Sequence, residues 1–117
     1  MSALQNSIML EYRIDRLREI MHREDVDAIM FFNPVNLRYF CGFTGTDGVL
    51  LVTREQSYFL TDSRYVAQAE AQVFAGFKRQ YSQKVEGVIE ALTECAVKRV
   101  GFESDFVTVS FHQKMLK

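Results

Sequence analysis

Cysteine is scarce in this sequence and forms no motif. Cys41 and Cys95 are the two cysteines, and no Cys-x-x-Cys pair occurs. We therefore expect two reduced thiols, with Cys95 packed on one face of a helix. A cysteine nucleophile needs a histidine within reach of its sulfur. His22 and His112 lie near opposite ends of the chain, and nothing in the sequence places either beside Cys41, so we expect no catalytic cysteine.

Long apolar runs and an excess of charge of one sign are also missing. The longest purely apolar runs, residues 28–32 and 49–52, are far too short to span a bilayer. The formal net charge of -1 gives no electrostatic reason to bind nucleic acid or an anionic membrane surface. The first thirty residues carry charged side chains where a secretory signal would need an apolar block. We therefore expect a cytoplasmic protein with no nucleic-acid or membrane partner.

The motifs of the common catalytic sites are absent as well. A zinc or two-metal site needs several His, Cys, Asp or Glu side chains at ligand spacing, and no His-Glu-x-x-His or similar pattern occurs. Gly42, Gly45 and Gly48 match neither phosphate-binding pattern, so they are interpreted as glycines that permit tight turns. The Gly-x-Ser-x-Gly motif of serine hydrolases is missing too. The chain therefore contains no complete active site that its sequence reveals.

What is present is the composition of one globular domain. The chain has 117 residues, of which 48% are hydrophobic and 25% are charged, values that are ordinary for a soluble protein. A chain of this length buries roughly two-thirds of its unfolded surface around a single core. No linker, repeat or low-complexity segment interrupts it, so we expect residues 1–117 to form a single domain.

Helix and strand patterns alternate along the chain. Apolar residues recur at helical spacing in four segments, which are residues 10–21, 65–73, 85–95 and 107–115. Five runs are typical of strands, at residues 28–32, 48–53, 57–61, 77–81 and 99–103. A three-residue connection predicts a β-hairpin between the second and third strands. A further short helix is expected between the first two strands.

Several polar residues and glycines mark the expected helix ends. Asn33 and Pro34 predict the start of the short helix, and Gly42 follows its end. Asp62 or Ser63 is expected to cap the next helix, which should end at Gly76. In a similar position, Ser82 is expected to open the helix over residues 85–95. The resulting order, α-β-α-β-β-α-β-α-β-α, predicts an α/β fold with a mixed sheet, one β-hairpin and helices on both faces.

The order of the central segment resembles a known family. Residues 36–45 read Asn-x-x-Tyr-Phe-x-Gly-Phe-Thr-Gly, and after the predicted hairpin residues 61–65 read Thr-Asp-x-Arg-Tyr. The leading helix, the Val-Asp-Ala of residues 26–28 and the Val-Gly-Phe-Glu of residues 100–103 agree with the same pattern. Together they resemble the N-terminal domain of the creatinase/prolidase/aminopeptidase P family. The resemblance runs from about residue 13 to residue 103.

This resemblance implies a ribonuclease H-like sheet topology and a place in a two-domain metallopeptidase that cleaves the bond before proline. In that family the C-terminal domain, with a pita-bread fold, holds two divalent ions, often manganese, cobalt or zinc, through two Asp, one His and two Glu. We expect that domain to be absent from this chain, which should hold no cofactor itself. The implied partners are the chain's own catalytic domain, further copies in a homodimer or homotetramer, and proline-containing peptides.

Two questions of function stay open at this point. The segments GFTGTDG and TDSRYVAQA are more similar to Xaa-Pro aminopeptidases, with a Xaa-Pro dipeptidase as the close alternative. Some relatives of this fold have lost catalysis, so the chain could instead be a stand-alone module that binds proteins or peptides.

The signature residues carry structural expectations. Asn36 and Tyr39 lie one helical turn apart, so Asn36 is expected to hold the loop around Gly42 and Gly45 by hydrogen bonding, with Tyr39 buried beneath it. Arg64 is expected to clamp a carboxylate or loop carbonyls with its planar guanidinium.

Three residues are candidates for a domain seam or a substrate entrance. Arg38 should point away from the loop, toward such a seam. Phe43 and Thr44 lie between two glycines, so they form either an exposed contact or part of the core. If the contact is exposed, the glycines let the backbone present Phe43 outward. Asp62 and Arg64 lie between a predicted strand and a predicted helix. As the alternative to their structural role, they could contact substrate.

Overall fold

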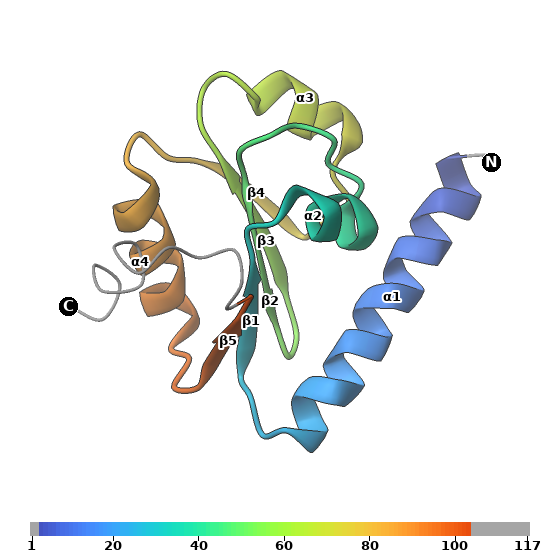
Figure 1. The fold of residues 1–117 in the computed structure, drawn as a ribbon, viewed down its shortest axis with the longest axis vertical. Coiled ribbons are helices and arrows are strands. Elements are labelled where there is room, and N and C mark those ends of the chain that lie inside the picture. The colour runs from blue at the N-terminus through green and yellow to red at the C-terminus, as the bar shows by residue number, and fades with distance from the viewer. Residues whose placement is uncertain (1–2, 104–117) are drawn as a thin grey trace.

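The computed structural model describes residues 3–103, with side chains from residue 7 onward (Figure 1). The elements are α1 (Ala3–Arg23), β1 (Ala28–Phe31), α2 (Pro34–Cys41), β2 (Val49–Thr53), β3 (Ser57–Thr61), α3 (Val66–Gln72), β4 (Phe77–Gln80), α4 (Lys84–Cys95) and β5 (Val100–Phe102). Over these residues the predicted order of helices and strands is confirmed. The last predicted helix, residues 107–115, lies outside the described residues.

The five strands form one mixed sheet in the order β4-β3-β2-β1-β5. β2 pairs antiparallel with β1 and β3, as the predicted hairpin requires. β1 pairs parallel with β5, and β3 pairs parallel with β4. β2 is therefore the strand that runs against the other four, whose carboxyl ends lie at the same edge of the sheet.

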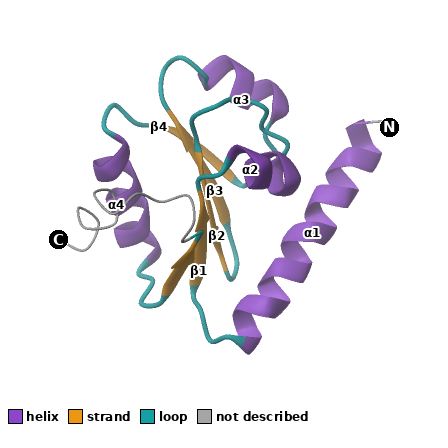
Figure 2. Cartoon of the chain, in the orientation of Figure 1, coloured by secondary structure: helices purple, strands orange, loops and turns teal. Residues whose placement is uncertain are grey.

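Helices cover both faces of the sheet, as predicted (Figure 2). α1, α2 and α3 lie on one face, and α4 lies on the other. The alternation along β2 divides its side chains between the two layers, because neighbouring residues of a strand point to opposite faces. Leu50 and Val52 pack in the core beneath α1, α2 and α3, and Leu51 packs in the core beneath α4. The central strands are buried on both faces, which explains why they read as continuous apolar runs.

The predicted boundaries of α2 are correct because its end signals are local. The Asn33 side chain accepts a hydrogen bond from the Val35 N–H at 3.0 Å, and Pro34 occupies the first turn. Gly42 ends the helix with φ of 84°, and its N–H donates to the Arg38 carbonyl at 3.1 Å. This left-handed conformation is one that glycine adopts readily.

Three other predicted helix ends are wrong. α3 begins at Val66 after Tyr65, which makes no side-chain cap, because the Asp62 carboxylate accepts from the Arg64 N–H in a preceding turn. α3 also ends at Gln72, before Gly76; the Gly76 N–H instead donates to Ser57 Oγ at 3.0 Å, beside the hairpin. α4 begins at Lys84 after Gln83, with no capping bond from Ser82.

Candidate functional site

The residues singled out in the sequence gather around the edge where four strands have their carboxyl ends. The loop of residues 42–48 lies between α2 and the start of β2, and the turn of residues 62–65 follows β3. The Thr61 hydroxyl donates to the Asp47 carbonyl at 2.8 Å, which joins the two segments. The loop, the turn and the first turn of α4 therefore form one continuous polar rim beside the two cores.

Phe43 belongs to the core, which is one of the two positions that its sequence context allowed. Its side chain is 0% exposed, and its ring centroid lies 4.7 Å from that of Phe59 and 5.8 Å from that of Tyr65. A Cβ atom on Gly45 would lie 2.3 Å from Phe43 Cζ. The glycines make room for the ring, and burying a phenyl group stabilises the fold by about 1.5–3 kcal/mol relative to exposing it.

Thr44 and Thr46 are the exposed residues of this loop. The Thr44 N–H donates to Gln72 Oε1 at 3.1 Å, and the Thr44 hydroxyl accepts from Gln68 Nε2 at 3.1 Å. The hydroxyls of Thr46 and Tyr65 lie 2.6 Å apart. These contacts tie the loop to α3 and hold Thr44 in a defined position at the surface. Its role at a seam stays a prediction.

Four charged side chains form a linked cluster at the rim. Arg64 Nη2 lies 2.6 Å from Asp62 Oδ2 and 3.3 Å from Asp47 Oδ2, and Lys84 Nζ lies 2.8 Å from Asp47 Oδ1. The guanidinium of Arg64 therefore clamps a carboxylate, as predicted. Its hydrogen bonds lower the pKa of Asp62, and Asp62 in turn raises the pKa of Arg64. The charges balance within the cluster, which favours a structural role for it.

Tyr81 lies beside this cluster and was not singled out in the sequence. Its side chain is buried, and its hydroxyl makes no hydrogen bond with any residue that the structure describes. Burial, with the nearby carboxylates of Asp47 and Asp62 as a smaller cause, raises the pKa of Tyr81. The phenol therefore stays protonated at neutral pH and cannot serve there as a base.

Asn36 does not hold the loop, contrary to prediction. Its Nδ2 donates to the carboxylate of Glu103, which also accepts from the N–H groups of Phe32 and Asn33. The pairing of β1 with β5 brings Glu103 to the start of α2, and that tertiary contact outcompetes the loop. Glu103 ties the end of β5 to the β1–α2 junction.

Tyr39 is not buried beneath the loop either. It is 49% exposed, because α2 turns Leu37 and Cys41 toward the core and leaves Tyr39 on its outer side. The guanidinium of Arg13 lies over the Tyr39 ring, 4.1 Å from its centroid, and Arg13 Nη1 donates to the Tyr39 carbonyl at 2.8 Å. Arg38 is exposed, and its side chain has no hydrogen bond or ion pair with the part of the chain that the structure describes.

The two thiols behave as expected. Cys41 is buried, its thiol donates to the Leu37 carbonyl at 3.2 Å, and burial raises its pKa to about 12. A thiol held protonated in this way is not a nucleophile at neutral pH. Cys95, the last residue of α4, is a free thiol that packs partly buried against the core beneath that helix.

Residues 3–103 contain no group of three or more His, Cys, Asp and Glu side chains placed to hold a metal ion. Among the same residues no helix is both long enough and apolar enough to cross a membrane. The site residues that the sequence analysis missed are Asp47, Lys84 and Glu103. Glu103 stands in the recognised Val-Gly-Phe-Glu segment and Asp47 in the GFTGTDG segment, but neither was given a role. No pattern marked Lys84, because its pairing depends on how α4 packs.

A comparison with protein families matches residues 13–117 to the family described as the creatinase/prolidase N-terminal domain. The uncharacterized peptidase YqhT of Bacillus subtilis is 29% identical over 98 residues, which are 82% of this chain and 28% of that protein. The chain therefore spans less than a third of this curated relative.

Solved structures with the same fold carry similar descriptions. A Xaa-Pro dipeptidase from Bacillus anthracis superposes with a TM-score of 0.85 at 32% identity, over 91% of this chain and 30% of that one. A Xaa-Pro aminopeptidase from Streptococcus pyogenes superposes with a TM-score of 0.82 at 33% identity, over 93% of this chain and 84% of that one. The predicted fold and the predicted resemblance are both confirmed.

Proposed function

The chain belongs to the creatinase/prolidase N-terminal domain family, and from that membership we propose that it is the non-catalytic N-terminal domain of a metal-dependent Xaa-Pro peptidase. In this role it assists oligomerisation and shapes the access of proline-containing peptides to the catalytic domain. The observation that carries the proposal is the match of the family over residues 13–117 in a chain that spans 28% of one longer relative.

The peptide-bond chemistry is assigned to the part of the relatives that this chain does not cover. Two divalent ions, manganese, cobalt or zinc, would supply an activated water there. The residues described here do not fit such a centre. Asp47 and Asp62, the two carboxylates that share the rim, are bound to Arg64 and Lys84, and cations at these positions oppose the binding of a metal ion.

Within the family we propose the aminopeptidase P type, on the similarity of residues 42–48 and 61–69, with the dipeptidase type as the alternative. A solved dipeptidase and a solved aminopeptidase resemble this chain at nearly equal sequence identity. Identity therefore does not separate the two types, and the substrate that is cleaved must decide between them. A protein that joins this chain to its catalytic domain should release the first residue from X-Pro-containing oligopeptides. Cleavage limited to X-Pro dipeptides would identify the dipeptidase type. We propose a cytoplasmic location for the whole protein, which cell fractionation would test.

The isolated chain should not hydrolyse X-Pro peptides when manganese, cobalt or zinc is added, because it lacks a dinuclear ligand set among its described residues. The measurement is release of the N-terminal amino acid by a highly purified sample, with the two-domain protein as the positive control. Metal-dependent turnover by the 117-residue chain that persists through purification would refute the assignment of a non-catalytic role.

A further inference from the structure

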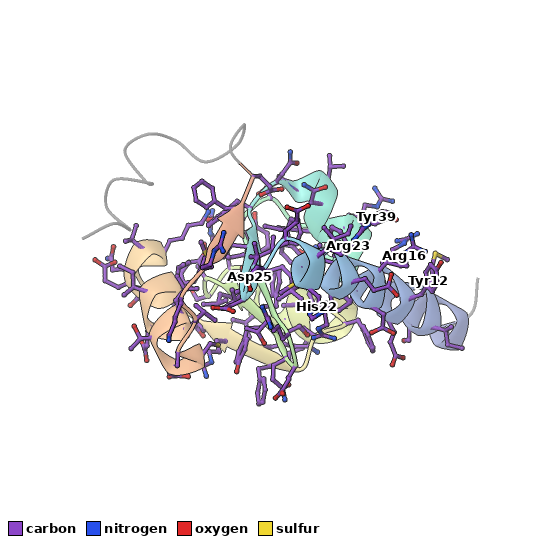
Figure 3. The ribbon with its side chains drawn as sticks, turned by 90° about the horizontal axis from the view of Figure 1, so that it is seen from below. Tyr12, Arg16, His22, Arg23, Asp25 and Tyr39 are labelled. Carbon is purple, nitrogen blue, oxygen red and sulfur yellow. The ribbon has the colours of Figure 1, made fainter. Side chains whose placement is uncertain are left out.

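An open groove runs between α1 and α2 on the outer side of the molecule. The groove has a volume of about 530 Å³. Its α1 side is the surface of that helix next to the stripe of residues that faces the core. The lining side chains are Met9, Tyr12, Arg13, Arg16, Leu17, Ile20, Tyr39 and Phe40. Seen from below, Tyr12 and Arg16 of α1 lie on the same side of the molecule as Tyr39 of α2 (Figure 3).

Three of the large apolar side chains that line the groove are exposed. Tyr12 is 60% exposed, and Ile20 and Tyr39 are each exposed by almost half. Single exposed apolar residues are normal on a protein surface, but a contiguous group marks an interaction site. Tyrosines are also the side chains that interfaces favour, since they combine a large apolar ring with a hydroxyl.

The groove is positively charged. Arg13 and Arg16 line it, and Arg38 lines an adjoining hollow that shares Arg13 and Tyr39 with it. No Asp or Glu is among the lining residues of either hollow. This excess is local, because the whole chain has a net charge of -1. The acidic residues Glu11 and Asp15 lie on the other flank of α1, toward the hairpin.

Little within the described residues neutralises these arginines. The contacts of Arg13 are to the Tyr39 carbonyl and ring and to Met9 Sδ, none of which is charged. Arg16 lies 3.7 Å from Glu19, but both side chains are more than half exposed, and such a surface pair is weak and readily exchanged. The Arg13 guanidinium is held in place against Tyr39, so little side-chain entropy is lost when it binds an anion.

We propose that this groove docks an acidic segment of a partner polypeptide. Carboxylates of the segment bind Arg13, Arg16 and Arg38, since the planar guanidinium matches a carboxylate with two parallel hydrogen bonds. Apolar side chains of the segment pack on Tyr12 and Tyr39. The groove is open, and its lining follows α1 from Met9 to Ile20, about three helical turns. Such a surface suits a peptide segment better than a small molecule that a pocket must enclose. Its charge and shape do not depend on the peptidase assignment, so docking can be tested separately.

The test uses the 117-residue chain and a defined probe, the fluorescein-labelled peptide Glu-Phe-Asp-Glu-Leu-Asp. Fluorescence anisotropy at low salt should show saturable binding that weakens as salt is added. A peptide with lysine in place of every acidic residue should not bind. The double variant Arg16→Glu/Arg38→Glu should weaken binding at least about tenfold, because both side chains are exposed and the change reverses the charge of the groove.

The matched control is Arg23→Glu/Lys98→Glu, which makes the same change of charge at two exposed positions that do not line the groove. It should bind the acidic peptide as the wild type does, and circular dichroism melts establish that both variants fold. Tyr12→Ser should weaken binding without changing its salt dependence. Equal binding by both double variants, or equal binding of the acidic and lysine peptides, would overturn the proposal. So would preferential binding of an oligonucleotide, or self-association of the chain that Arg16→Glu/Arg38→Glu abolishes.

Discussion

Asp62 and Arg64 were recognised as signature residues, but the sequence does not give their contribution to the stability of the fold. Arg64 was expected to clamp a carboxylate or loop carbonyls, and Asp62 was expected to cap the next helix. In the structure the clamped carboxylate is that of Asp62, which accepts from both the guanidinium and the N–H of Arg64. The side chain of Arg64 is largely exposed, so solvent screens the ion pair and its contribution to stability is small. The pair therefore sets the shape of the turn more than the stability of the domain.

The first prediction concerns the titration of Asp62. The hydrogen bonds from Arg64 lower its pKa, so this carboxylate contributes stability above its unfolded pKa of about 3.9, and the contribution is lost as the pH falls through the folded value. Arg64→Ala should raise the pKa of Asp62 toward its ordinary value. Carboxyl-carbon NMR titration measures it, with Asp27 and Glu94 as internal controls. An unchanged Asp62 pKa in the variant would show that Arg64 is not the cause.

The second prediction concerns Gly45. Gly45→Ala should destabilise the domain by about 1–3 kcal/mol, because the added methyl group would overlap the buried ring of Phe43. Urea unfolding of the variant and the wild type gives the difference. Gly101→Ala is the matched control, since its Cβ would meet Ile29 Cγ1 at an ordinary 3.6 Å. If the two variants unfold at the same urea concentration, the loop can move aside and Phe43 is not fixed by it.

The roles of single residues were the least predictable feature of the chain. The partner of Asn36 is Glu103, 67 positions away in sequence, and Tyr39 is exposed beneath a guanidinium from α1. Neither contact leaves a local pattern, because both depend on the packing of distant elements. Phe43 illustrates the same limit, since neighbouring glycines are equally compatible with an exposed ring and with a ring that they make room for.

At the scale of elements, local chemistry was a sound guide where nothing competed with it. The start and end of α2 follow from Asn33, Pro34 and Gly42, whose hydrogen bonds are all within the helix or beside it. The start of α3 was misplaced because Arg64 takes the carboxylate that was expected to cap the helix. A helix cap can therefore be read from sequence only when its side chain has no stronger partner nearby.

The third prediction tests how β5 is joined to the rest of the sheet. Glu103→Ala should destabilise the domain by roughly 1–3 kcal/mol, because the Phe32 and Asn33 N–H groups and Asn36 Nδ2 lose their shared acceptor. Urea unfolding measures the loss of stability. Relative to the wild type, amide hydrogen exchange should accelerate most in β5 and at the start of α2. Glu70→Ala, a change at an exposed acidic residue of α3, is the control. Equal protection of β5 in both variants would show that strand pairing alone holds it.

For the whole molecule, the sheet is the part that the sequence predicted well. The strands are apolar runs buried on both faces, and the helices between them each carry one apolar stripe. Few arrangements other than a sheet between two helical layers can bury both. β2 and β3 illustrate this, since they are joined by a short hairpin and their buried residues contribute to both cores. The groove between α1 and α2 was not predicted, because it depends on which flank of α1 faces a neighbouring helix.

The last prediction concerns self-association of the isolated chain. We expect the isolated chain to be a monomer or a weak dimer, with any contact at the loop of residues 41–47 or at the helix predicted over residues 107–115. Phe43→Ser would be the obvious test of the loop. Since Phe43 is buried, that substitution would damage the core instead of an interface. Thr44→Lys is the sound variant, because Thr44 is the exposed residue whose contacts are all with α3.

The groove between α1 and α2 is an unfavourable interface for a dimer of two copies of this chain. A symmetric dimer brings the same surface of both chains together, so Arg13, Arg16 and Arg38 of one copy would face the same three arginines of the other. Sedimentation velocity at several concentrations should therefore show a monomer or a weak dimer, and added salt should not break up any dimer held by the loop. A tight dimer that dissociates with Arg38→Glu but not with Thr44→Lys would contradict this expectation. The contact would then lie at the arginine-lined groove and not at the loop of residues 41–47.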